Sequence, residues 1–311
     1  MKRFEIEKVI AFFFVLYIFI MCLYTTVDSI IENNISEEDI TYYLENDIPF
    51  RDVYIDVYGF IQRILEKKQI EQFTIFKNSY DKLVKVNDLI PEYEIESKVD
   101  EVNKLFEYCN KRNIPYLYVN SILPISDTSD LPYKDIDHTI ENAECLQHIL
   151  DKKGINILDI RNNPNINNIP KESRFYKTDH HWTTVTSFVT FQEIIRTLNE
   201  QYGLDVNENL INDSNYSIKT YKDSFLGSYG VKVGEYYSGR DDFNIYIPKF
   251  KNVFSFKAYD ADGVLIDEKE GEWFDCLMDQ DILNNSNYEN KYNAWSNMGY
   301  VENIIINNEA D

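Results

Sequence analysis

The first apolar feature of the chain is an uncharged run over residues 9–27, which follows a basic N-terminus. At about 1.5 Å rise per residue, a helix of this length comes close to spanning a hydrocarbon core of about 30 Å. Acidic residues follow the run, so the positive-inside rule predicts a cytoplasmic tip over residues 1–8 and a single-pass anchor in the cell membrane, with the main domain outside. No A-x-A-like site follows, which favours an uncleaved signal anchor over a cleaved signal peptide.

The next segments read as a stalk and a membrane-proximal module. Residues 28–50 are acidic, rich in Asn and aperiodic, and are expected to form the stalk. Within the module, over residues 51–94, apolar positions recur at helical spacing and predict an amphipathic helix over 51–67. Those positions are Val53, Val57, Phe60, Ile61, Ile64 and Leu65. Packing against the rest of the protein is the expected role of this face.

From about residue 95 the pattern becomes αβαβ. Apolar residues recur at helical spacing from Val99 to Cys109 and again from Ile136 to Leu150. Each helix is followed by an apolar run of strand length, Ile114–Leu123 and Ile155–Ile160. Such alternation implies right-handed βαβ units and a parallel sheet. The sequence therefore predicts an α/β domain over 95–311.

Capping residues set the expected ends of the helices. Ser97 is available to cap the first helix, and Gly154 is the expected C-cap of the second. A further amphipathic helix begins near residue 184, with Thr183 or Thr184 as its N-cap.

Residues 215–275 have a different pattern, with short candidate strands at Asn244–Ile247, Val253–Tyr259 and Val264–Asp267. Turns are expected at Gly227, Gly234, Gly239 and Gly263. These residues are predicted to form a β-rich insertion.

Charge and cysteine content exclude several classes of protein. Among 311 residues, Lys and Arg number 31 and Asp and Glu 53, which gives a net charge of −22. Such a chain is not expected to bind nucleic acid or anionic head groups, because both are bound chiefly by cationic side chains. The cysteines, which are Cys22, Cys109, Cys145 and Cys276, have no CxxC spacing. They predict neither a zinc knuckle nor a disulfide framework.

The candidate chemistry centres on Asp179-His180-His181-Trp182, which holds two of the four histidines. Two residues apart, Asp179 and His181 fall on the same side of an extended segment. The carboxylate can then fix the tautomer of His181 and stabilise its imidazolium. His180 is expected to point the other way, and Trp182 to pack behind the loop. Alternatively, Asp179 only turns the chain and both histidines are incidental.

The segment Phe175–Thr183, leading into a helix, resembles the DHHW protein family, which is related to the alginate O-acetylation proteins of the SGNH hydrolase superfamily. The resemblance extends to Ile48–Arg51, to the helix and strand over 97–123, and to Ser224–Ser228. It implies an SGNH-like parallel sheet flanked by helices, incomplete in this chain. It also implies that Asp179 and His181 are the acid and base members of a Ser-His-Asp triad, with His180 and Trp182 supporting them.

By the same resemblance, the chain would be a cell-surface O-acyl transferase or esterase, typically for acetyl groups on polysaccharide. The superfamily needs no metal or organic cofactor for this reaction. Related systems receive the acyl donor from a multi-pass membrane O-acyltransferase, which is therefore an expected partner.

The nucleophile implied by the resemblance is missing. In alginate-type members a serine follows the Asp-x-His element, directly after a buried strand, and no such element follows here. Tyr292–Trp295 and then Tyr300–Ile306 resemble the stretch that precedes that strand. The hypothesis is that the chain is a C-terminally truncated fragment or a decayed copy, and that it is inactive as it stands. The candidate that the sequence offers in place of this nucleophile is Ser224, within Asp223-Ser224-Phe225. Ser121 lies at the end of the strand Ile114–Leu123 and is expected to cap that strand or to line a cleft.

Two other functions stay open at this point. A non-catalytic surface module could bind a membrane acyltransferase, or it could bind glycan through aromatic side chains in or near the insertion, which are Trp273, Tyr236, Tyr237 and Tyr246. A metal-dependent DHH phosphoesterase also carries an Asp-His-His string, but its string follows an apolar strand and is partnered by an upstream Asp cluster. Neither feature is visible in this sequence.

Overall fold

The structure is a computed structural model that describes residues 12, 16, 17, 19, 20, 51–70, 74–132, 137–285, 290–295 and 300–309. The predicted stalk over 28–50, most of the predicted anchor, Cys22 and Ile136 lie outside the described residues. Within the described residues, no helix combines the length and apolar character that a membrane crossing requires.

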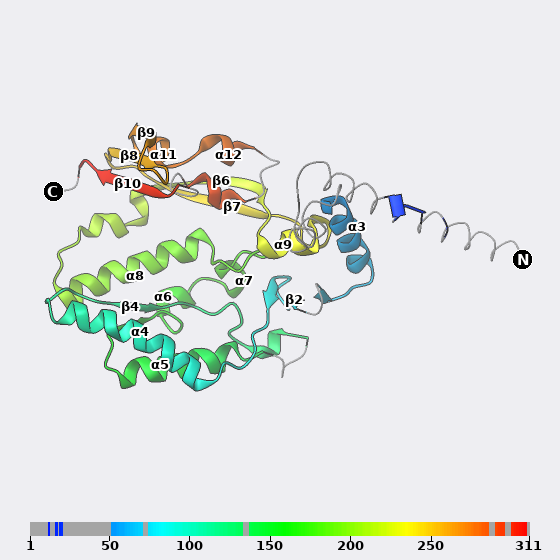
Figure 1. Ribbon diagram of the computed structural model, residues 1–311, viewed down its shortest axis with the longest axis horizontal. Helices are drawn as coiled ribbons and strands as arrows, with labels where there is room; N and C mark the ends of the chain where they lie inside the picture. The colour runs from blue at the N-terminus through cyan, green and yellow to red at the C-terminus, as the bar shows by residue number, and fades with distance from the viewer. Residues whose placement is uncertain are drawn as a thin grey trace, which may run out of the picture.

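Two short parallel strands, β4 (Tyr118–Asn120) and β5 (Ile157–Asp159), form the centre of the α/β part. They are joined through α5 (Thr139–Lys152), as the alternating pattern predicts. Side chains on one face of the pair pack with α4 (Glu92–Asn110) and α5, and those on the other face with α8 (Thr184–Tyr202). Figure 1 shows α8 on one side of these strands and α4 and α5 on the other.

The helix ends agree with the sequence at Thr183, lie one residue off at Gly154 and differ at Ser97. Thr183 caps α8, with its hydroxyl accepting from the amide of Thr186. The C-cap of α5 is Lys153, and the expected Gly154 follows it with a left-handed φ of 68°. Ser97 is not a cap, because α4 already begins after Pro91. Proline is suited to the start of a helix, and two glutamates in the first turn favour its dipole.

Residues 51–94, which the sequence predicts as a membrane-proximal module, contain more than the predicted helix. The helix is α3 (Arg51–Ile64), and a small antiparallel sheet in the order β1-β2-β3 follows it. Its strands are Gln69–Ile70, Ile75–Lys77 and Leu83–Lys85. Strands of two or three residues are too short for an alternating pattern to reveal them.

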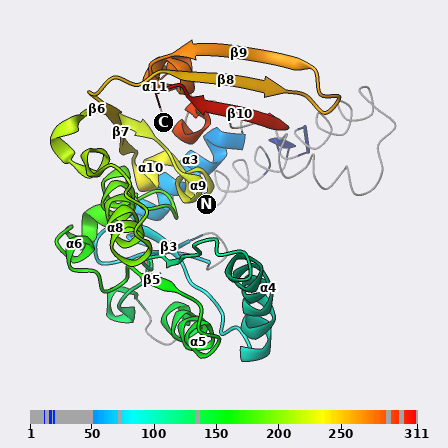
Figure 2. The same cartoon turned by 90° about the vertical axis from the view of Figure 1, so that its left-hand side faces the viewer.

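The β-rich region is confirmed and extends beyond the predicted insertion. A hairpin-like pair, β6 (Tyr216–Phe225) and β7 (Asp241–Pro248), runs antiparallel, and its connection holds α9 (Ser228–Val233) and α10 (Glu235–Ser238). A second sheet has the order β10-β8-β9, from Glu302–Asn307, Phe254–Tyr259 and Leu265–Gly271. Viewed from the side, this sheet lies above the β6–β7 pair, with α8, the parallel strands, and α4 and α5 below (Figure 2).

The remaining elements are short. They are η1 (Thr128–Asp130), α6 (Pro164–Asn167), α7 (Lys171–Arg174), η3 (Glu208–Ile211), η4 (Asp213–Asn215), α11 (Trp273–Leu277), α12 (Gln280–Asn284) and η5 (Lys291–Ala294). Cys109, Cys145 and Cys276 are free thiols, and the first and last are buried. The described chain is thus a mixed α/β fold with several small sheets, which is consistent with the SGNH-like expectation.

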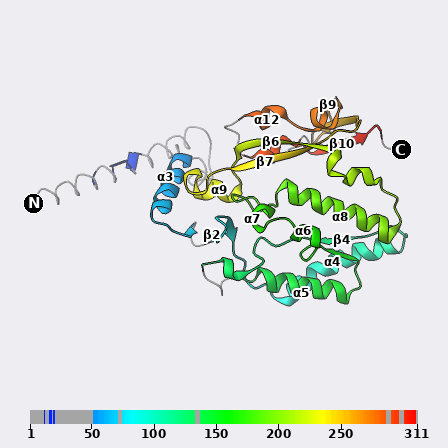
Figure 3. The same cartoon turned by 180° about the vertical axis from the view of Figure 1, so that it is seen from behind.

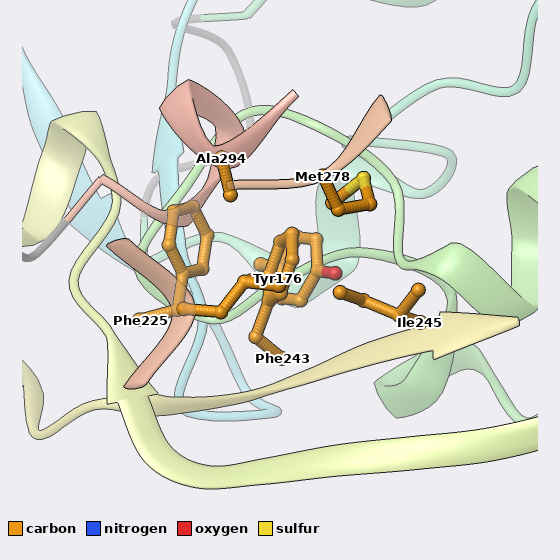
Figure 4. Packing of buried hydrophobic residues seen from close by; sticks show 7 residues of the cluster. Tyr176, Phe225, Phe243, Ile245, Met278 and Ala294 are labelled. Atoms are coloured by element: carbon orange, nitrogen blue, oxygen red, sulfur yellow. The ribbon is translucent and has the colours of Figure 1, made fainter. Parts of the chain in front are cut away.

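One buried cluster joins the β6–β7 pair to the loop that carries the candidate chemistry (Figure 4). Tyr176, three residues before Asp179, packs edge-on against Phe225 of β6 at 4.9 Å between ring centroids. It also stacks on Phe243 of β7 at 6.1 Å. Since Tyr176 is only 3% exposed, the start of the loop is fixed by core packing.

Truncating this core tests how strongly it holds the fold. We expect Phe225→Ala to cost about 3–5 kcal/mol of unfolding free energy, because a fully buried ring leaves a cavity among aromatic neighbours. Val301→Ala is the matched control, since that side chain is 72% exposed, and it is expected to stay within about 0.5 kcal/mol of the native chain. Urea unfolding followed by circular dichroism measures both. Equal midpoints for the two variants would contradict the central role of the cluster.

Candidate functional site

The Asp179–Trp182 sequence lies in a tight loop between α7 and α8. Phe175 and Trp182 face each other across an antiparallel bridge. Beyond the bridge the amide of Thr183 donates to the carbonyl of Arg174 at 2.9 Å, which leads directly into α8. Trp182 packs with the apolar cluster behind the loop, as predicted. The loop is therefore closed at its base by backbone pairing and a partly buried indole.

Asp179 and His181 form a hydrogen-bonded pair. The Nδ1 of His181 lies 2.5 Å from Oδ1 of Asp179, and the backbone amide of His181 donates to the same oxygen at 2.9 Å. Oδ2 of Asp179 accepts from the amide of Ser228, the first residue of α9, at 2.6 Å. The predicted pairing of carboxylate and imidazole is thus present in the structure.

These hydrogen bonds decide the charge of the buried carboxylate. Burial alone would raise the pKa of Asp179, because it penalises the ionised form. The amides of Ser228 and His181 and the imidazole of His181 outweigh that effect and hold the pKa of Asp179 below its ordinary value of 3.8. Asp179 is therefore an anion at neutral pH, although its side chain is only 4% exposed.

Thr178, fully buried beside Asp179, anchors the loop to β7 and α9. Its hydroxyl donates to Asp241 of β7 at 2.6 Å and accepts from the amide of Gly227 at 2.8 Å. Its carbonyl accepts from the amides of Tyr229 and Gly230 at 3.0 and 2.9 Å. Together these bonds fix the backbone immediately before the carboxylate.

Asp241 and strand β3 hold the preceding residue as well. The two carboxylate oxygens of Asp241 accept from the amides of Lys177 and Thr178, each at 2.9 Å. On its other side, the carbonyl of Lys177 accepts from the amide of Leu83 at 2.8 Å. The loop therefore reaches Asp179 with its backbone tied to two different sheets.

Gly227 allows the closest approach in the site. A β-carbon at this position would lie 2.2 Å from Cβ of Asp179 and 2.6 Å from Oδ2. It would also lie 2.7 Å from the carbonyl oxygen of Thr178. No side chain larger than hydrogen fits there without moving the carboxylate. The absence of a β-carbon thus brings the amide of Ser228 within hydrogen-bonding distance of Asp179.

His180 does not point away from His181, so that prediction is wrong. The two rings lie 3.9 Å apart between centroids, and Nδ1 of His180 is 3.5 Å from Oδ1 of Asp179. Sides alternate only in an extended strand, whereas this segment turns within a loop. Nδ1 of His180 also lies 3.0 Å from the hydroxyl of Ser228, which ties the exposed histidine to α9.

The other edge of His181 is open to a ligand. Its side chain is 49% exposed, and within the described part of the chain no hydrogen bond is recorded for Nε2. The ring of Tyr292 lies 4.9 Å away, tilted by 56°, and limits access on one side. Burial raises the pKa of Tyr292, so this phenol is neutral beside the imidazole. His181 can accept a proton from a group that approaches Nε2.

The serine that sequence reasoning offered as a substitute nucleophile lies in β6. The hydroxyl of Ser224 donates to the carbonyl of Tyr221 at 2.8 Å, within its own strand. Among the described residues, no hydrogen bond joins Ser224 to either histidine. Ser228 is the serine that the fold brings to the histidines, through His180. Its position follows from α9, which the sequence did not predict as a helix.

Asp179, His180 and His181 could also surround a cation. Each offers one ligand atom, and these atoms lie within 4.8 Å of one another. However, both oxygens of Asp179 already accept N–H donors, and His181 uses Nδ1 for the carboxylate. A metal would have to compete with these bonds, which fit proton transfer better than coordination.

Comparison with solved structures shows that the mixed α/β fold around this site occurs in another protein. No protein family model matches the chain, and no curated protein matches it. The chain is similar to Bacillus cereus PatB1 with a sulfonyl adduct, with a TM-score of 0.55 and 19% identity over 76% of this chain and 74% of that one. In the comparison with another PatB1 structure, this chain spans 65% of the length of the matched PatB1 chain.

Two further solved structures show weaker likenesses. One is a DHHW family protein from Eubacterium siraeum, with a TM-score of 0.41 and 16% identity over 62% of this chain and 59% of that one. The other is the O-acetyltransferase domain of Pseudomonas putida AlgJ, with a TM-score of 0.44 and 10% identity over 56% and 65%. The likeness to PatB1 shows a shared fold, and the Asp179–Trp182 loop of this chain holds the paired carboxylate and imidazole described above.

A substitution at Gly227 tests the close approach. We expect Gly227→Ala to lower the unfolding free energy by about 1–3 kcal/mol, because the new methyl group overlaps Asp179 and Thr178. Gly271→Ala is the matched control, since a β-carbon there meets nothing within 4 Å. Thermal unfolding of both variants measures the difference. If Gly227→Ala were as stable as Gly271→Ala, the packing of α9 on the loop would have to be looser than described.

The ionised state of Asp179 predicts a pH dependence. Because its folded pKa lies below 3.8, Asp179 stabilises the fold above its unfolded pKa, and this contribution is lost as the pH falls through the folded value. We expect the unfolding free energy of the native chain to fall more steeply below about pH 4 than that of Asp179→Asn. Urea unfolding between pH 7 and pH 3 measures both slopes. Exposed Asp262→Asn should keep the native slope; a native slope in Asp179→Asn would refute the argument.

Proposed function

We propose that Asp179 and His181 are the acid–base pair of an O-acyl transferase or esterase, with acetyl as the acyl group and a cell-surface polysaccharide as the substrate. The observation that carries the proposal is the geometry of the pair: a buried carboxylate lies 2.5 Å from Nδ1 of an imidazole that is itself half-exposed. The fold shared with PatB1 supports the same class of protein.

The pair would work on an alcohol that approaches Nε2 of His181. As the oxygen of the alcohol attacks the acyl carbonyl carbon, its proton passes to Nε2 and the anionic Asp179 stabilises the imidazolium. When the tetrahedral species collapses, the bond from the acyl carbon to the leaving oxygen breaks, and His181 returns the proton to that oxygen. No metal or organic cofactor takes part in this scheme.

The rigidity of the loop supports the assignment. Asp179 is held by the amides of His181 and Ser228, and the backbone before it by Thr178 and Asp241. A base that keeps its tautomer and orientation needs such restraint, since small displacements weaken proton transfer. A carboxylate that merely turned the chain would not need donors from a second, distant segment.

The scheme leaves open which group supplies the alcohol. Ser224 bonds within its own strand and Ser228 contacts His180, and within the described residues no hydrogen bond joins either hydroxyl to His181. In our scheme the pair acts on an alcohol that joins it, either a sugar hydroxyl of the acceptor or a serine. Treatment of the full chain with a sulfonyl fluoride, followed by peptide mass mapping, identifies any serine that the pair activates.

The location of the chain is part of the proposal. The uncharged run over residues 9–27 would anchor it in the cell membrane, with the site on the outer side. That position suits a polysaccharide acceptor. It would also let a membrane O-acyltransferase supply the acyl donor.

A non-catalytic glycan-binding role is the alternative, and one observation favours it. A cavity of about 990 Å³ adjoins α8, β7 and α11. Its aromatic lining includes Phe188, Tyr216, Tyr246, Phe250, Trp273 and Trp295. Tyr246 and Trp273 were among the predicted sugar-stacking residues, whereas Tyr237 is buried elsewhere in the core. Tyr292 lines the cavity and also contacts His181, so a bound ligand would lie beside the site.

An esterase assay with p-nitrophenyl acetate tests the proposed function. We expect His181→Ala to lower the rate of the full chain by about 100-fold, since a positioned general base contributes at least that factor. Asp179→Asn should give a similar loss, because the wrong tautomer is then favoured. Addition of a chelator should leave the native rate unchanged, in contrast to a metal-dependent phosphoesterase.

Free imidazole also cleaves this ester, so the control is another histidine. His148 is exposed on α5, and His148→Ala should keep the native rate. If the native chain, His181→Ala and His148→Ala had equal rates, the acyl-transfer proposal would fail for this chain. Binding of acetylated oligosaccharide by that same chain, lost in Trp273→Ala, would then favour the binding role.

A further inference from the structure

Helix α3 is turned with its apolar face away from the protein. An amphipathic helix normally packs an apolar stripe of 100° or more against the core. In α3 the exposed apolar and tyrosine positions cover about 160° of the helical wheel, at 100° per residue, whereas Ile55 lies outside this arc and is half-buried. The exposed positions are Val53 (54% exposed), Tyr54 (37%), Val57 (51%), Tyr58 (45%), Phe60 (50%), Ile61 (47%), Ile64 (64%) and, just after the helix, Leu65 (59%).

The opposite face of α3 is the one that packs on the protein. Gly59 is buried, and a β-carbon there would lie 2.3 Å from the carbonyl oxygen of Val233 in α9. Asp56 accepts from the amide of Glu235 at 2.7 Å, and the guanidinium of Arg63 donates to the carbonyl of Tyr236 at 3.2 Å. Polar and small residues thus hold α3 to α9 and α10, and at one border of the exposed face the ring of Phe60 also contacts Tyr236 of α10 edge-on, at 6.4 Å between centroids.

Rotating the helix to bury its apolar face would break these contacts. The exposed surface is therefore a property of the docked helix, and it is too large and continuous for scattered surface residues. Among the residues of this face, none is charged, although the whole chain carries a net charge of −22. An acidic or basic protein partner would find no complementary group here.

The surface continues onto the N-terminal apolar run. Tyr17 contacts Tyr54 of α3, with ring centroids 6.2 Å apart and planes at 70°. The other described residues of that run, Phe12, Leu16, Phe19 and Ile20, are also exposed. One apolar surface thus leads from a segment suited to a hydrocarbon core onto α3. Tyr54 and Tyr58 are of the residue type that prefers the membrane–water boundary.

We propose that α3 lies in the interface of a lipid bilayer, with Val53, Val57, Ile61 and Ile64 among the upper acyl chains. The attraction is apolar burial, so zwitterionic lipid suffices and anionic head groups are not required. Because α3 packs on α9, and the amide of Ser228 at the start of α9 binds Asp179, this contact would set the orientation of the site toward the membrane. The inference does not depend on whether the site transfers acyl groups.

Tryptophan quenching by brominated lipid tests the proposal on the full chain. Val57→Trp places a reporter on the exposed face of α3, and Leu105→Trp places one on α4, where the native side chain is similarly exposed at 53%. Figures 1 and 3 show α4 apart from α3. Each variant is reconstituted in phosphatidylcholine vesicles with and without brominated acyl chains, and the signal of the native chain is subtracted.

We expect brominated lipid to quench the Val57→Trp reporter by about half or more and to leave the Leu105→Trp reporter nearly unchanged, as burial of about 5–10 Å into the interface implies. Adding Ile61→Asp and Ile64→Asp to the first variant should abolish the quenching with no loss of circular dichroism, since both side chains are exposed. Equal quenching of the two reporters would overturn the proposal. So would a blue-shifted but unquenched Val57→Trp reporter, which would mean that protein, either the N-terminal run or a second copy, covers the face.

Discussion

A carboxylate that leaves water must be surrounded by hydrogen-bond donors, and the region around Asp179 is organised by this requirement. Its donors are the imidazole and amide of His181 and the amide of Ser228. The first two belong to the loop itself, whereas Ser228 belongs to a short helix 49 positions further along the chain. The anion is therefore fully satisfied only when α9 is docked, so the reactive loop and the β-rich region must assemble together.

The same dependence reaches the rest of the molecule through Thr178. Its hydroxyl and carbonyl join β7 and the start of α9, and α9 in turn packs on α3. Tyr176 repeats the connection in apolar form, because it packs between Phe225 and Phe243. The hydrogen bonds of Thr178 and the apolar packing of Tyr176 thus both hold the loop against the β6–β7 pair. The histidine pair gains its fixed geometry from sheets that hold none of its own residues.

The sequence predicts the long helices and the parallel strand pair well, because α4, α5 and α8 each show the helical period over several turns. It misses the sheet β1-β2-β3, whose strands are too short to show a pattern. In the site, Asp179 and His181 are two residues apart, and this spacing predicts that their side chains lie on the same side of the chain. The loop keeps them on the same side, so the predicted pair forms. The roles of Asp241 and Gly227 depend on contacts across about 50 to 60 residues, for which local pattern gives no signal.

The contact between Gly227 and Asp179 has a consequence for tracing this site in other chains. The Asp-His-His-Trp string is short enough to occur by chance, and its own residues do not suffice to stabilise a buried carboxylate. The string indicates such a site when a second segment of the chain supplies a glycine next to the aspartate. The residue after that glycine must then donate its backbone amide to the carboxylate. A search that requires this pair of segments, at compatible separation, would distinguish inherited sites from chance strings without any knowledge of the nucleophile.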